Sequence, residues 1–180
     1  MNNIFRNAVV AIVVLAAVSL LNRNVGNAQG TVFTSTAPIR GYYLTKSTIT
    51  GSKVLTACAS GYHFASIWEI LNTSDLHYNT TLGRTNVNSG HGAPAVTGHS
   101  TLADAAYGWI RTGGPDDPNC VNWTSSNATD AGSIGGLDIP GGGAQPQWVI
   151  DNGTGGGTAI SCDGTLSGTP LSVGAWCVQN

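Results

Sequence analysis

The apolar positions of the chain fall in short runs, which predicts many short elements instead of a few long ones. Tyr42–Thr45 follows a glycine, is rich in aromatic and β-branched residues, and predicts a first strand. Gly108–Thr112 predicts a central strand whose Trp109 and Ile110 pack in the core. Further strands are predicted at Trp148–Ile150 and at Leu171–Val178, the latter as the closing strand.

Two short helices are expected near the start of this pattern. Ser52–Ala59 predicts the first helix, with Gly61 placed where a left-handed C-terminal cap needs a glycine. His63–Ala65 follows as an extended connector. Along the first helix the small or apolar residues expected on one side are Val54, Leu55 and Ala59.

Ser66 and Glu69 have the spacing of a capping box, which predicts that a second helix begins here. Glu69 is the single glutamate of the chain, and the cap is its expected role. We expect the residues of this stretch to be core and to set the fold, including the apolar residues that the helix carries: Ile67, Trp68, Ile70 and Leu71.

Elsewhere the pattern is weaker. Leu76, Tyr78 and Leu82 are expected to anchor loops on the core, and residues 101–107 to hold a helical turn. The segment 113–161 is irregular, with ten glycines between Gly132 and Gly157, and Trp148–Ile150 is its one predicted strand. Loops of this length in a compact domain are usually functional or disordered, so the loop-rich segment 113–161 is a candidate for either.

Residues 1–28 have the pattern of a signal peptide. Arg6 precedes an apolar run, Ala8–Leu21, in which Ser19 is the one polar residue, and the small residues of Gly26–Ala28 suit a cleavage site. The run is short for a membrane span, so we expect export and cleavage, with no membrane insertion afterwards; an uncleaved anchor is the alternative. Residues 29–180 then form a single secreted domain.

Charge and cysteine content bear on partners and compartment. The mature chain has five Lys or Arg against nine Asp or Glu, a net charge near −4, which disfavours nucleic acid and anionic membranes. Its four cysteines lie in the exported part and predict disulfides, since no C-x-x-C pair suggests zinc or redox chemistry. Spacing allows three ways of pairing them.

The regions around the first and the last cysteine resemble the corresponding parts of C-type lectin-like domains. A cysteine, a glycine and an A-S-I-x-E step occur at the first cysteine, and W-C-V at the last. A group of secreted bacterial proteins with the C-type lectin-like (endostatin-like) fold is a closer match, through the segments Tyr42–Thr45, Ala57–Ser66, Gly108–Gly113, Asn119–Ser125 and Trp176–Val178.

This resemblance implies an α+β, C-type lectin-like fold, with two short helices flanking small antiparallel sheets and a long Gly-rich loop region. It also implies the disulfides Cys58–Cys177 and Cys120–Cys162. In the chain-entropy model each would stabilise the domain by roughly 4–5 kcal/mol, because both loops are long.

Sugar-binding members of the family hold calcium on carboxylate and amide oxygens, and calcium needs six to eight oxygen ligands. Oxygen-bearing side chains around Pro and Gly make calcium a candidate cofactor here, although no triplet matches the family in both sequence and position. The competing interpretation is that these polar residues around Pro and Gly only form turns. The candidate ligand-binding residues are Asp116, Asp117, Asn119, Gln145, Gln147, Asp151 and Asn152.

Trp123 and Trp148 lie in the same segment. An exposed indole would stack on a sugar or anchor a protein, whereas a buried one would hold the loops to the core, which is the favoured interpretation. His91 and His99 lack a third ligand at a fixed spacing, so no metal site is assigned to them. His63 is expected to be a hydrogen-bonded structural residue.

No nucleophile elbow, zinc-helix motif or phosphate loop occurs, and no catalytic residue is assigned. We therefore expect a non-enzymatic secreted module that binds an extracellular glycan or protein through its long-loop face. The alternative is a self-assembling structural subunit of a cell-surface layer or extracellular filament. Low charge and Thr-, Asn- and Gly-rich surfaces suit such packing between copies.

Overall fold

The computed structural model describes residues 39–86, 89–96, 106–138, 147–151, 160–166 and 169–180. The predicted signal peptide and most of the predicted helical turn at residues 101–107 lie outside these ranges. All of the described residues belong to one unit, which spans Ala37–Asn180.

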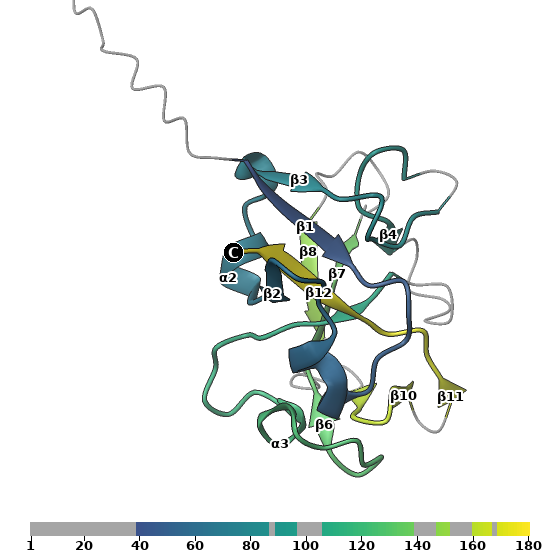
Figure 1. Cartoon of the computed structure of the whole chain (residues 1–180). Helices are drawn as coiled ribbons and strands as arrows, with labels where there is room; N and C mark the ends of the chain where they lie inside the picture. The colour runs from purple at the N-terminus through teal and green to yellow at the C-terminus, as the bar shows by residue number, and fades with distance from the viewer. Residues whose placement is uncertain (1–38, 87–88, 97–105, 139–146, 152–159, 167–168) are drawn as a thin grey trace, which may run out of the picture. The chain divides into compact units, whose positions relative to one another are not determined.

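The described part of the chain is a mixed α+β structure made mostly of strands, as the α+β prediction has it (Figure 1). Helices are short: η1 (Gly51–Thr56), α2 (Ile67–Ile70), η2 (Thr73–Asp75) and α3 (Cys120–Trp123). The strands are β1 (Arg40–Leu44), β2 (Tyr62–Phe64), β3 (Leu76–Tyr78), β4 (Ala95–Val96), β5 (Gly108–Trp109), β6 (Ala131–Gly132), β7 (Ile134–Asp138), β8 (Gln147–Asp151), β9 (Ile160–Ser161), β10 (Thr165–Leu166), β11 (Thr169–Pro170) and β12 (Gly174–Gln179).

Eight of these strands form one mixed sheet, which corrects the expectation of small antiparallel sheets. Its order is β3-β1-β12-β5-β7-β4, with β2 on β12 and β8 on β7. Three neighbouring pairs are parallel: β1 with β3, β12 with β5, and β4 with β7. Two further sheets, β6–β9 and β10–β11, have two strands each. Leu76 and Tyr78, which were expected to anchor loops on the core, form the ends of strand β3.

The closing strand β12 pairs with three others. Cys177 lies opposite Tyr43 of β1 on one side and opposite Phe64 of β2 on the other. Ala175, nearer the start of β12, pairs with Trp109 of β5. Figure 1 shows β12 running between β1 and β2, with the C-terminus beside α2.

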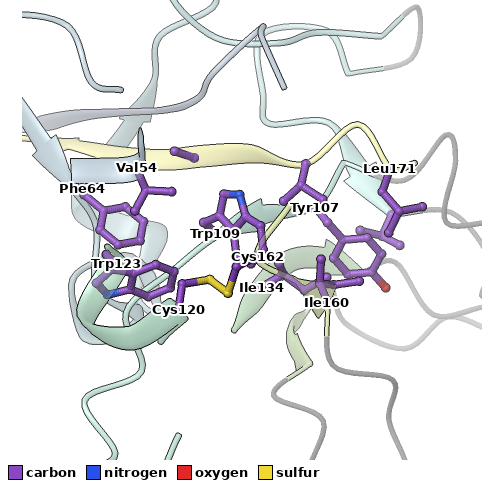
Figure 2. Close-up of a cluster of buried hydrophobic side chains, with 13 residues drawn as sticks. Val54, Phe64, Tyr107, Trp109, Cys120, Trp123, Ile134, Ile160, Cys162 and Leu171 are labelled. Carbon is purple, nitrogen blue, oxygen red and sulfur yellow. A yellow bond between two sulfur atoms is a disulfide. The ribbon is translucent and has the colours of Figure 1, made fainter. Parts of the chain in front are cut away.

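Two clusters of buried side chains make the core, and each surrounds a fully buried tryptophan. One contains Trp109 together with Cys120, Cys162 and Trp123, and Figure 2 shows the disulfide among these rings. The other contains Trp176 and Cys177, packed with tyrosines of β1 and β3. The predicted packing of Trp109 and Ile110 is confirmed, since neither is accessible to solvent.

Both cysteine pairs are those that the family resemblance implies. Cys58 is bonded to Cys177 across 119 residues, and Cys120 to Cys162 across 42 residues. In the chain-entropy model these separations correspond to about 5 and about 4 kcal/mol of stabilisation.

The first predicted helix is corrected to a shorter 3₁₀ helix. Backbone N–H groups bond three residues back in η1, as from Ala57 to Val54 at 3.2 Å, and the helix ends before Cys58. Val54 is buried while the adjacent Leu55 is exposed, because neighbouring residues of a helix do not share a face. Gly61 has φ +82° but lies in the tight turn that leads into β2, so it is not a helix cap.

The second helix begins as its capping box predicts. Glu69 Oε2 accepts hydrogen bonds from the backbone N–H and the hydroxyl of Ser66, both at 2.9 Å. Its other oxygen lies 2.7 Å from His63 Nε2, while His63 Nδ1 lies 2.6 Å from Asn180 Oδ1. The prediction of a hydrogen-bonded structural His63 is confirmed.

The apolar residues of α2 do not all face the core, which corrects the expectation that they do. Ile67 and Ile70, three residues apart, are buried. Trp68 is 73% exposed and Leu71 54% exposed, because they lie on the opposite side of the same short helix.

The Gly-rich segment is more regular than its composition predicts. Besides the expected β8 it contains β6, β7 and β9. Gly135 and Gly136 lie inside β7, where Cβ atoms would come within 2.9 Å of Ile150 and 2.5 Å of Val96. Glycine at these two positions allows the neighbouring strands to pack closely, although glycine weakens strands in general.

The packing of β5 against β1 and β12 leaves no room for a side chain at Gly108. A Cβ atom there would lie 2.8 Å from Trp176 Cδ1 and would also meet the side chain of Leu44. We expect Gly108→Ala to lower the free energy of unfolding by about 1–3 kcal/mol, measured by urea denaturation. Gly92→Ala is the matched control, since its added Cβ has 3.4 Å to the nearest atom. Equal stability of both variants would contradict this packing.

The Glu69 cap predicts an acid-dependent loss of stability. Burial raises the pKa of Glu69, but the hydrogen bonds from Ser66 and His63 outweigh it and bring the pKa below 4.5. The folded chain thus holds the proton less tightly than the unfolded chain. The stabilisation is complete above pH 4.5 and is lost as pH falls through the lower folded pKa.

We expect Glu69→Gln to cost about 1–2 kcal/mol at pH 7, since the bonds to a charged acceptor are weakened. The difference from the unchanged protein should shrink as the pH is lowered below about 4, when urea denaturation is followed as a function of pH. A difference that is constant from pH 7 to pH 3 would show that the charge of Glu69 does not contribute.

Candidate functional site

A surface hollow of about 200 Å³ lies where the chain leaves β5 and reaches α3. Three of the predicted ligand-binding residues line it, Asp117, Asn119 and Trp123, so the structure brings these together. The other lining residues come soon after β5: Arg111, Thr112, Gly113 and Gly114.

One wall of the hollow is fixed to the sheet through Arg111. Its backbone N–H donates to Ala65 at 3.1 Å, and its carbonyl accepts from Ile67 at 2.7 Å, which ties the start of α2 to this wall. Its guanidinium lies over the ring of Phe64, 5.5 Å from the centroid, and donates to the Phe64 carbonyl. Arg111 Nε is buried without an acceptor in the described structure, a cost of about 1–3 kcal/mol.

The floor consists of two glycines that no other residue can replace without displacing a neighbour. A Cβ atom on Gly114 would lie 2.7 Å from the carboxyl carbon of Asp117. Gly113 has φ +80°, and its Cβ would lie 3.2 Å from Trp68 Nε1. The floor is therefore a strip of bare backbone between the Asp117 carboxylate and the indole of Trp68.

The far wall contains a turn of left-handed helix. All four residues of α3 have positive φ, from 49° at Cys120 to 62° at Trp123. Left-handed helical backbone costs roughly 1–2 kcal/mol per residue when a Cβ is present, and Val121, which is β-branched, is an unfavourable choice for it. Backbone strain of this kind concentrates at functional sites.

Three features hold this turn in place. Asn119 Oδ1 accepts from the backbone N–H of Asn122 at 3.0 Å, which orients the Asn119 side chain at the edge of the hollow. Cys120 is tied to Cys162 in the core. The ring of Trp123 meets those of Phe64 and Trp109 edge-to-face, with centroids 4.9 Å and 6.1 Å away.

Trp123 is therefore an anchor of the loop to the core, as the favoured interpretation has it. It lines the hollow but is only 8% exposed, so its ring face is not open for stacking. Trp148 is half-buried and packs edge-to-face on Trp176 at 4.9 Å, so it also belongs to the core.

The other predicted ligand residues are not brought to the hollow. Asp116 is exposed beside it and does not line it. Gln147 and Asp151 begin and end β8, opposite Asp138 and Ile134, and their side chains lie outside the described structure. Gln145 and Asn152 fall outside the described residues altogether.

Trp68, at the rim of the hollow, is the functional candidate that the sequence pattern assigned to the core. Its Nε1–H donates to the carbonyl of Thr112 at 3.1 Å, so the ring is fixed by one edge while its face is exposed. The spacing of Ile67 and Ile70 was the available signal, because two buried residues three apart place the intervening residue outside.

A second hollow, about 370 Å³ in volume, lies between β3 and the end of β12. Two pairs of its polar groups are engaged with each other: Asn79 Nδ2 donates to the hydroxyl of Tyr62 at 3.1 Å, and Gln179 Oε1 accepts from the Gly41 N–H at 2.8 Å. Its lining residues include the exposed His77 but no carboxylate, and in the described part of the chain no exposed indole adjoins it as Trp68 adjoins Gly113 of the first hollow. The hollow beside Trp68 is therefore the stronger candidate.

Within the described ranges, no three His, Cys, Asp or Glu side chains come together as a metal site would require. Asp117 and Asn119 share a hollow but make up a small part of the six to eight oxygens that calcium prefers. Calcium binding stays a prediction. None of the helices in the described part of the chain has the length and apolar character of a membrane span.

Comparison with known proteins finds no matching family model, no similar curated protein and no similar solved structure. The disulfides and the described helices are compatible with an extracellular protein.

The left-handed turn predicts an unusual response to glycine. Val121 is 57% exposed, so its side chain contributes little packing, and glycine would relieve its strain at φ 54°. We expect Val121→Gly to preserve the free energy of unfolding or raise it by up to about 1 kcal/mol. The matched change Leu55→Gly, at an exposed residue of η1, should lower it by about 1 kcal/mol. Equal losses in chemical denaturation would contradict the left-handed conformation.

Proposed function

We propose that the protein is a secreted, non-enzymatic recognition module with a C-type lectin-like fold. It binds an extracellular glycan or protein through the hollow lined by Arg111, the glycines Gly113 and Gly114, Asp117 and Asn119. The observation that carries the proposal is the convergence of Asp117 and Asn119, chosen from sequence as ligand-binding residues, on one hollow with a bare backbone floor.

The fold assignment rests on three features of the chain. A closing C-terminal strand pairs with the first strand, the outer disulfide joins that strand to the segment before β2, and the inner disulfide closes the loop-rich segment at its base. The mixed α+β architecture is compatible with this assignment. The mixed sheet and the short helices are weaker support for this fold assignment, because many other folds contain them.

Binding without catalysis fits the chemistry of the hollow. The side chain of Asp117 accepts hydrogen bonds, that of Asn119 both donates and accepts, and the guanidinium of Arg111 donates. The pair that most resembles catalytic machinery, His63 with Glu69, does not line the hollow and is engaged in the helix cap. A rigid hollow with fixed polar groups suits recognition, because little conformational entropy is lost on binding.

The proposal predicts that binding depends on the carboxylate of Asp117. The purified domain is screened against immobilised extracellular glycans and proteins, with calcium and again with chelator, and the affinity for each ligand found is measured by titration. Asp117→Asn should weaken binding about tenfold or more, because a hydrogen bond to a charged group is lost.

Asp116→Asn is the matched control, since it removes the same charge at the neighbouring exposed residue that does not line the hollow. Equal weakening by both changes would place binding outside the hollow. A protein that binds no glycan or protein, but assembles with itself as its concentration rises, would instead be a structural subunit.

A further inference from the structure

Trp68 is exposed in a way that folding does not explain. Of the five tryptophans, Trp109 and Trp176 are completely buried, Trp123 is 8% exposed and Trp148 is half-buried, whereas Trp68 is 73% exposed. An indole is a large apolar surface, and each Å² of it left in water forgoes about 25 cal/mol. The chain thus keeps one costly ring at the rim of its candidate site.

The ring is held in a fixed position. Its Nε1–H donates to the Thr112 carbonyl at 3.1 Å, and α2, which carries it, is secured by the Glu69 cap and by the bond from Ile67 to Arg111. A ring fixed in this way loses little freedom when a ligand binds, so more of the contact energy appears as affinity.

The neighbouring glycines set what the ring can contact. A Cβ on Gly113 would lie 3.2 Å from Trp68 Nε1, at the edge of the ring, and a Cβ on Gly114 would lie 2.7 Å from the carboxyl carbon of Asp117, so two adjacent bare positions adjoin the indole and the carboxylate. A ligand that crosses this strip meets an apolar face at one side and hydrogen-bonding groups at the other.

We propose that this strip binds one pyranose ring of a neutral glycan, stacked on Trp68 with its hydroxyl groups turned toward Asp117 and Asn119. The inference rests on the proposed function and names its ligand class. A pyranose has C–H groups on one face, which are attracted to the negative face of an indole, and hydroxyl groups around its edge. Those hydroxyls both donate and accept, as the carboxylate and amide of the hollow require.

Other occupants fit less well. The carboxylate of Asp117 and the net charge near −4 of residues 29–180 disfavour polyanions such as nucleic acids. A hollow of about 200 Å³ is below the usual range for drug-sized ligands and suits a single small ring. A protein partner would rely on a wider apolar surface around its anchor.

The test uses β-linked and α-linked neutral oligosaccharides of glucose, galactose, mannose, xylose and N-acetylglucosamine as probes. Affinity is measured by titration, and iodide quenching of tryptophan fluorescence reports on exposed indoles, of which Trp68 is the most accessible in the described structure. We expect at least one probe to bind and to protect Trp68 from iodide.

Three variants identify the contact. Trp68→Leu keeps apolar bulk but removes the ring, and we expect it to weaken binding about tenfold or more. Trp68→Phe, which keeps an aromatic face, should bind more tightly than Trp68→Leu. Leu71→Ala removes the other exposed apolar side chain of this surface of α2 and should leave the affinity unchanged.

Each remaining outcome overturns the proposal. If a glycan binds with dependence on Asp117 but equally well to Trp68→Leu, the proposed stacking on Trp68 is wrong, while the proposed recognition function stands. If an extracellular protein binds and no neutral oligosaccharide does, the ligand class is wrong and recognition again stands. If neither glycan nor protein binds, both the inference and the proposed function fail.

Discussion

The pairing of β12 with β1, β2 and β5 is the interaction on which the rest of the structure depends. It brings the two ends of the described domain together, and the outer disulfide fixes Cys177 of this strand to Cys58. Because β5 lies parallel to β12, the residues after β5 reach the start of α2, where Arg111 bonds to Ala65 and Ile67. The hollow is a consequence of this placement, since its glycine floor lies just beyond Arg111 in the chain.

The opposite wall of the hollow is stabilised by a different set of interactions. Four left-handed residues cost roughly 4–8 kcal/mol at about 1–2 kcal/mol each. The inner disulfide returns about 4 kcal/mol by constraining the unfolded chain, and burial of Trp123 contributes about 2–3 kcal/mol more. The strained turn can therefore persist because Cys120 and Trp123, its first and last residues, are both anchored in the core. Asn119 immediately precedes the turn, and its position at the hollow results from these anchors.

The sequence predicts elements whose signals are local. The Ser66–Glu69 cap, the strand at Tyr42–Thr45 and the buried Trp109 could be found because spacing and side-chain type specify them. Strand β7 could not be predicted, because glycine has low strand propensity. Its glycines are explained by close packing against side chains of other strands, Ile150 of β8 and Val96 of β4. The left-handed turn was also unpredictable, because α3 contains no glycine and two of its anchors, the disulfide to Cys162 and the packing of Trp123 on Phe64 and Trp109, are not local in sequence. Of the site, Asp117 and Asn119 were found by residue type; the exposure of Trp68 could have been inferred from the spacing of Ile67 and Ile70, whereas its place beside the hollow and the role of Arg111 required the three-dimensional arrangement.

Three features around the hollow lower the stability of the folded protein. A buried N–H of Arg111 lacks an acceptor in the described structure, α3 has a strained backbone, and Trp68 leaves most of an indole in water. Each lowers stability by on the order of one to a few kcal/mol, a large effect in a domain that is stable by about 5–15 kcal/mol. Proteins generally break the local rules of folding where function demands it. Two of these departures involve residues that line one hollow of about 200 Å³, and the third, Trp68, lies next to its Gly113. Trp148 Nε1, the other buried side-chain N–H without an acceptor in the described structure, does not line it. Under the proposed function a bound ligand would cover the indole.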